Sequence, residues 1–207
     1  MLRNMMIDVL TQTWPMLVIC SIIFVSLRVT FLIKSDKKIY IHKELLMYLF
    51  GIYIMCLFTV VTYGDVQSYG SNYIPFKEMF RYTLWSNLFI KNVLGNMLMF
   101  VPYGFFLGYF VKVNKIYAVV FLSSLVSITV EIIQKNIGRV FDIDDIILNV
   151  VGALIGFIIY KIFEKIKDKL PRFLKNTVFY SIILIGLITL FILYLMKIIE
   201  VYNVWNN

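Results

Sequence analysis

The chain has few charged residues: 15% of its 207 residues are Asp, Glu, Lys or Arg, whereas 61% are hydrophobic. Water-soluble domains carry about 25% charged residues, so this composition excludes a mainly soluble protein. Cysteine is scarce as well, because only Cys20 and Cys56 are present and both lie inside apolar runs. A thiol in such a run behaves as a small hydrophobe, and no disulfide framework is predicted.

Several chemical signatures are also missing. The sequence has no P-loop, no nucleotide-binding glycine fingerprint, no G-x-S-x-G elbow and no H-E-x-x-H pair, which excludes the usual soluble hydrolase and metalloprotease mechanisms. Its acidic run from Asp142 to Asp145 lacks the glycine and distal glutamate of an EF-hand, and His42 lies in a basic loop. We therefore predict no metal and no other cofactor.

Long apolar stretches dominate what is present. A membrane-spanning helix needs about 17 to 25 mostly apolar residues, and six such stretches follow one another, at 14–33, 44–62, 94–111, 116–134, 146–163 and 178–199. The sequence thus predicts an all-α integral membrane protein, a compact bundle of about six transmembrane helices. Within the long connection 63–93, the stretch from Lys77 to Lys91 is predicted to lie in the membrane interface as an amphipathic helix.

The basic residues predict how the helices are oriented. The first, third and fifth loops hold twelve Lys and Arg, whereas the opposite side holds seven. Because basic residues near helix ends are retained in the cytoplasm, both termini and the second and fourth loops are predicted to lie outside. The net charge of +8 comes mainly from these loops, so we predict no nucleic-acid partner.

Polar side chains at membrane depth normally face the bundle interior and mark functional sites. Helical spacing puts Glu131 and Gln134 on one stripe of the fourth helix, and puts Asp142, Asp145 and Asn149 on one face at the start of the fifth. We expect a cluster at the outer ends of helices three to five, with Arg139 as its bidentate cationic partner. The predicted ligand-binding residues are Asn96, Glu131, Gln134, Arg139, Asp142, Asp145 and Asn149.

Simpler roles compete with this interpretation. The amides of Asn96, Gln134 and Asn149 would form hydrogen bonds between helices. Asp142 would be a helix cap, and Asp144 a solvated surface charge. Two glycine pairs with GxxxG spacing allow close helix packing, either within one chain or in an oligomer. These pairs are Gly104 with Gly108 and Gly152 with Gly156.

Four blocks of sequence stand out along the middle of the chain. They are Tyr73-Ile74-Pro75-Phe76, Gly95-Asn96-Met97-Leu98-Met99-Phe100-Val101-Pro102-Tyr103-Gly104, Glu131-Ile132-Ile133-Gln134, and Gly138-Arg139-Val140-Phe141-Asp142-Ile143-Asp144-Asp145 followed by Asn149 and Gly152. In this order they resemble the VanZ-like family of bacterial membrane proteins. The resemblance covers about residues 44–163 and divides the chain into an N-terminal transmembrane helix with its basic loop (1–43), a core of four transmembrane helices (44–163), and a basic loop with the C-terminal transmembrane helix (164–207).

The resemblance implies a location in the cytoplasmic membrane of a Gram-positive bacterium and a link to resistance against teicoplanin-type glycopeptide and lipoglycopeptide antibiotics. It supplies no reaction, and whether the protein is an enzyme stays open. The first hypothesis is binding or remodelling of an envelope lipid or cell-wall precursor at the outer face. The alternatives are a membrane-embedded hydrolase or transferase, with Glu131 or Asp145 as general base and Arg139 stabilising negative charge, and a transporter or flippase.

Overall fold

The computed structural model describes residues 2–35, 39–62, 70–169, 178–190 and 193. Within these ranges the chain is helical and contains no strand, which confirms the all-α prediction. Five of the described helices are long and apolar enough to cross a membrane, and the protein is a multi-pass membrane protein. Of the sixth predicted span, a shorter apolar helix over Val178–Leu190 is described, and most of the remainder lies outside the described residues.

The chain divides into two compact units, which are Met1–Cys56 with Lys169–Asn207, and Leu57–Asp168. The first unit contains α1 (Leu2–Lys34) and the beginning of α2 (Ile41–Thr62). Arg28 on α1 meets Glu44 on α2 through two hydrogen bonds, Nε to Oε2 at 2.6 Å and Nη2 to Oε1 at 2.9 Å. A charge inside a spanning helix is costly unless it is paired, so this ion pair accounts for an arginine in an apolar helix.

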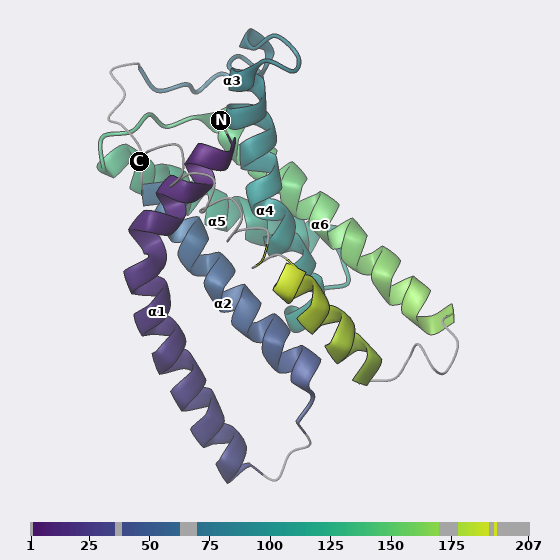
Figure 1. Ribbon diagram of the computed structural model, residues 1–207. Coiled ribbons are helices and arrows are strands. Elements are labelled where there is room, and N and C mark those ends of the chain that lie inside the picture. The colour runs from purple at the N-terminus through teal and green to yellow at the C-terminus, as the bar shows by residue number, and fades with distance from the viewer. Residues whose placement is uncertain (1, 36–38, 63–69, 170–177, 191–192, 194–207) are drawn as a thin grey trace. The chain divides into compact units, whose positions relative to one another are not determined.

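The second unit holds the end of α2 and the elements that follow it (Figure 1). Its first span, Asn87–Val111, is built from α3 (Asn87–Phe89), η2 (Ile90–Leu94), α4 (Gly95–Phe106) and η3 (Leu107–Val111). It begins earlier than predicted because the Ser86 side chain accepts a hydrogen bond from the Phe89 N–H at 3.1 Å and caps the first turn. The unit continues with α5 (Ile116–Asn136) and α6 (Ile143–Lys169).

The predicted amphipathic helix between Lys77 and Lys91 is wrong. Only a single 3₁₀ turn, η1 (Met79–Arg81), forms before the span begins at Asn87. Phe76 and Trp85 adopt left-handed backbone conformations, with φ of 68° and 64°. Such a residue interrupts a right-handed helix and costs roughly 1 to 2 kcal/mol when it carries a side chain, so neighbouring contacts must hold this segment in place.

Glycines bring α4 and α6 into close contact, and the two helices lie side by side (Figure 1, teal and green). A Cβ atom at Gly104 would lie 1.8 Å from the Ala153 carbonyl oxygen, and one at Gly152 would lie 1.9 Å from that of Met97. The pairs Gly104 with Gly108 and Gly152 with Gly156 are therefore packed against helices of the same chain. Of the two predicted uses of these pairs, packing within the chain is the one observed, and these faces are not free to form an oligomer.

Candidate functional site

The turn after α5 returns the chain over the end of that helix. Gly138 has φ of 87°, the Gly138 N–H donates to the Lys135 carbonyl, and the Arg139 N–H donates to the Gln134 carbonyl at 2.9 Å. This pattern of bonds is a Schellman motif, which needs a residue that tolerates a left-handed conformation, and glycine does so without strain. The motif places Arg139 beside the last turns of α5.

The predicted residues at the start of α4, the end of α5 and the start of α6 are here called the polar cluster. Glu131 lies at its centre and is only 1% exposed. Its Oε2 accepts a hydrogen bond from the Asp142 N–H at 3.0 Å. We assign the Gln134 amide the orientation that satisfies both of its neighbours, in which its nitrogen donates to Glu131 Oε1 at 2.9 Å and its oxygen accepts from Arg139 Nη1 at 2.9 Å. Both oxygens of the buried carboxyl group are thus hydrogen-bonded, as buried polar atoms require.

Arg139 is linked to the acidic residues indirectly. Its Nη1 donates to the Val61 carbonyl at 3.0 Å as well as to Gln134. The predicted bidentate contact with a carboxylate is wrong, since Arg139 forms no ion pair with any residue that the structure describes. The same set of residues offers no hydrogen-bond partner to its Nε and Nη2, so the half-buried guanidinium keeps donors for a further acceptor.

Asp142 caps α6, which is the simpler of the two roles that the sequence suggested for it. Its Oδ1 accepts hydrogen bonds from the Asp144 N–H at 2.9 Å and from the Asn72 amide at 2.8 Å. Asn72 also pairs with this segment through its backbone, because its N–H donates to Phe141 at 2.8 Å and its carbonyl accepts from Ile143 at 3.1 Å. Burial raises the pKa of Asp142 above its ordinary value, although the hydrogen bonds from Asp144 and Asn72 oppose this.

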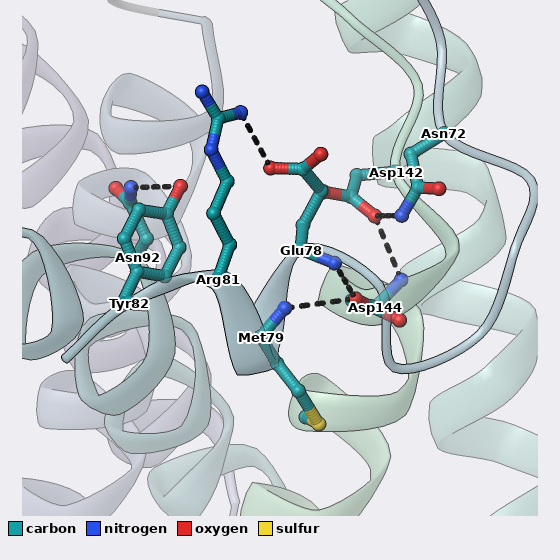
Figure 2. Close-up of polar contacts among 8 residues, drawn as sticks. All are labelled: Asn72, Glu78, Met79, Arg81, Tyr82, Asn92, Asp142 and Asp144. Carbon is teal, nitrogen blue, oxygen red and sulfur yellow. Dashed lines mark hydrogen bonds and ion pairs between the residues drawn. The ribbon is translucent and has the colours of Figure 1, made fainter. Parts of the chain in front are cut away.

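Asp144 was predicted as a solvated surface charge, and this is wrong because its side chain is buried, with 1% exposure. Figure 2 shows its carboxylate facing the backbone nitrogens of Glu78 and Met79, which donate to Oδ2 at 2.8 and 3.0 Å. The Phe76 N–H donates to Oδ1 at 2.5 Å. Three N–H groups that no helix or strand satisfies therefore converge on one carboxylate.

The remaining predicted residues lie along the inner faces of α4 and α6. The Asn96 amide donates a hydrogen bond to Asp145 Oδ1, which joins the two helices. One turn further along α6, the Asn149 amide donates to Ser127 Oγ on α5 at 2.9 Å, and Asn149 is 1% exposed. Both asparagines connect neighbouring helices, as the simpler interpretation of the amides expected.

The structure thus places six of the seven predicted residues near the starts of α4 and α6 and the end of α5, in two hydrogen-bonded groups. Asn96 pairs with Asp145, and Glu131 connects Gln134, Arg139 and Asp142, while Asn149 lies one turn further along α6. Sequence reasoning missed Asn72 and the buried role of Asp144. The only signal was indirect: both lie in or beside the quoted blocks at 73–76 and 138–145. In the described ranges no three His, Cys, Asp or Glu side chains are arranged to hold a metal ion.

This arrangement can recognise a ligand with mixed polarity. Arg139 retains hydrogen-bond donors that suit an anionic oxygen, and a guanidinium matches phosphate geometry well. Asp145 receives its hydrogen bond at Oδ1, and Oδ2 has no partner among the described residues. An unoccupied carboxylate oxygen can accept from a hydroxyl or amide group.

Comparison with known proteins gives a family. The family model VanZ/LLP1 matches residues 45–164, a stretch that contains the whole polar cluster. No curated protein and no solved structure matches the chain. Because the matched residues make up more than half of the sequence, the chain belongs to the VanZ/LLP1 family of membrane proteins.

Proposed function

We propose that this protein contributes to resistance against teicoplanin-type glycopeptide and lipoglycopeptide antibiotics by binding or remodelling an envelope lipid or cell-wall precursor at the outer face of the bacterial cytoplasmic membrane. The observation that carries the proposal is the setting of Arg139. Its Nη1 is fixed by Val61 and Gln134, while Nε and Nη2 have no partner in the described part of the chain. A fixed guanidinium beside membrane-spanning helices suits the phosphate of a lipid headgroup.

The acidic residues favour a ligand that carries hydroxyl or amide groups besides a phosphate. Glu131, Asp142 and Asp145 lie around the same site and offer oxygen acceptors, which a simple anion without a hydrogen to donate does not match. Sugar hydroxyls and peptide N–H groups are donors that these carboxylates can accept. Envelope lipids and cell-wall precursors that combine a phosphate with a sugar or peptide meet both requirements.

The outer location rests on the distribution of Lys and Arg. Twelve of these residues lie in the loops on the side opposite to the cluster, against seven on the cluster's own side. Cytoplasmic loops carry the excess of basic residues, so the proposal puts both termini and the cluster outside. This leaflet is the one that a glycopeptide antibiotic reaches first.

Susceptibility to teicoplanin tests the proposal, in cells that express the normal protein or the variants Arg139→Gln and Asp145→Asn at matched levels. The control is Glu164→Gln, which makes the same acid-to-amide change on α6 at an exposed ion pair with Lys161. Loss of protection in both cluster variants, with protection retained in the control, is the expected result. Unchanged protection in all three would refute a role for the cluster.

A hydrolase or transferase is the second candidate, and one observation selects its general base. Both oxygens of Glu131 accept hydrogen bonds, whereas Asp145 Oδ2 has no partner among the described residues. Asp145 is therefore better placed than Glu131 to take a proton from a substrate. Lipid extracts of cells with and without the protein separate the two functions, because catalysis yields a chemically altered lipid that depends on Asp145 and binding alone yields none.

A further inference from the structure

The connection between residues 76 and 88, here called the aromatic loop, exposes a group of large apolar side chains. Phe80 is 80% exposed, and Leu84 and Trp85 are each 75% exposed. Phe76 and Leu88 are also exposed. Apolar side chains on the spanning helices are covered by lipid, but most of this loop precedes the first helical residue of its span, Asn87. A cluster of this kind outside a span marks an interaction surface.

The aromatic loop is held in one conformation by specific bonds. Asp144 accepts from the Phe76 N–H. Figure 2 shows that it also accepts from the N–H groups of Glu78 and Met79, and that the Tyr82 hydroxyl accepts from the Asn92 amide at 2.9 Å. Trp85 has a left-handed backbone conformation and is followed directly by the Ser86 cap of the span. A strained backbone persists only where its surroundings fix it, and such positions gather at functional sites.

The position of the aromatic loop in the sequence determines its depth in the membrane. Residues 87–111 form a spanning helix, so the residues that enter it lie at one surface of the bilayer. Aromatic side chains are favoured at that surface, because their rings are apolar and the headgroup layer accepts their polar edges. Exposure of the same apolar side chains to water is unfavourable, so the headgroup layer is their preferred environment.

The charges in and beside the loop are mainly basic. Lys77 and Lys91 are exposed, and Arg81 is paired with Glu78 at 3.2 Å, so the segment carries a net positive charge. Lysine ammonium groups near a membrane surface attract anionic phospholipid headgroups. Aromatic and basic side chains on one segment therefore fit a single partner, an anionic lipid surface.

We propose that the aromatic loop inserts Phe80, Leu84 and Trp85 into the headgroup layer beside the spanning helices, with Lys77 and Lys91 on anionic lipid phosphates. The loop is bonded to Asp144, and Asp144 donates its N–H to the Asp142 cap. Lipids held by the loop are thus brought next to the polar cluster. This inference concerns the bulk lipid around the protein and does not depend on the ligand of the cluster.

Tryptophan fluorescence tests the insertion. The full chain is made with Trp14→Phe and Trp205→Phe, so that Trp85 is the only tryptophan, and is reconstituted into phosphatidylcholine vesicles containing phosphatidylglycerol. We expect blue-shifted emission, quenching by lipids brominated near the headgroup, and protection from aqueous iodide. Red-shifted emission with full iodide quenching and no quenching by brominated lipid would overturn the proposal.

The charge requirement is tested in the same background. Quenching of Trp85 fluorescence by brominated lipid is expected to rise severalfold as phosphatidylglycerol replaces phosphatidylcholine. The double variant Lys77→Gln, Lys91→Gln is expected to abolish that rise. Lys161→Gln, which lies on α6 away from the loop, is the matched control and should leave it unchanged. Equal quenching in both lipids would overturn the selection of anionic lipid. Antibiotic susceptibility is read separately, so failure of this inference is distinguishable from failure of the proposed function.

Discussion

Asp144→Asn is the substitution for which the structure predicts the largest local effect. The carboxylate accepts three backbone N–H groups, two of them at Oδ2, and is buried. A hydrogen bond to a charged group contributes about 1.5 to 3 kcal/mol. Asparagine keeps one acceptor oxygen and turns its amide donors toward at least one of the N–H groups, so the free energy of unfolding should fall by about 2 to 4 kcal/mol.

The assay is thermal unfolding of the purified protein in detergent, followed by limited proteolysis of the aromatic loop. A loss of this size lowers the midpoint by roughly 5 to 15 °C for a chain of this length, and cleavage should become concentrated between residues 76 and 88. Glu164→Gln serves as control, because an exposed ion pair contributes less than about 1 kcal/mol. Equal midpoints and equal proteolysis for the two variants would refute the buried role of Asp144.

Two further predictions concern packing and pH. Gly152→Ala should destabilise the protein by about 1 to 3 kcal/mol in the same thermal assay, because its Cβ would meet the Met97 carbonyl oxygen, whereas Gly51→Ala has open space and should not. Because burial raises the pKa of Asp142, the folded state binds its proton more tightly than the unfolded state does, so stability should decline as pH rises above about 3.8. Asp142→Asn should flatten that decline between pH 4 and the raised pKa, and an unchanged profile would contradict the assignment.

The helices and their close packing could be predicted because their causes are local in sequence. Long apolar runs identify spans by length alone, and five of the six are observed as helices long enough to cross a membrane. Gly104 and Gly152 signal close approach by their spacing, although the sequence did not say which helix each would meet. Asp142 could be assigned as a cap because it directly precedes an apolar helix.

The roles of Asp144 and Arg139 could not be predicted, because each depends on a segment far away in the chain. Asp144 is buried only because residues 76–79 fold back onto it, and Arg139 is held by a carbonyl on α2. From the neighbouring sequence alone, Asp144 is expected to be an exposed acid in a loop, and Arg139 is expected to pair with the acidic residues beside it. The prediction of an amphipathic helix was wrong for a related reason. Phe76 and Trp85 adopt left-handed conformations that no propensity scale assigns to aromatic residues.

The most direct test of the account is the lipid that the protein carries when it is purified in mild detergent. Mass spectrometry should find one envelope lipid with a phosphate and a sugar or peptide headgroup, enriched over its share in the membrane. Arg139→Gln and Asp145→Asn should lose that enrichment, and Glu164→Gln should keep it. The same lipid profile in all four preparations would contradict the claim that the polar cluster binds an envelope lipid.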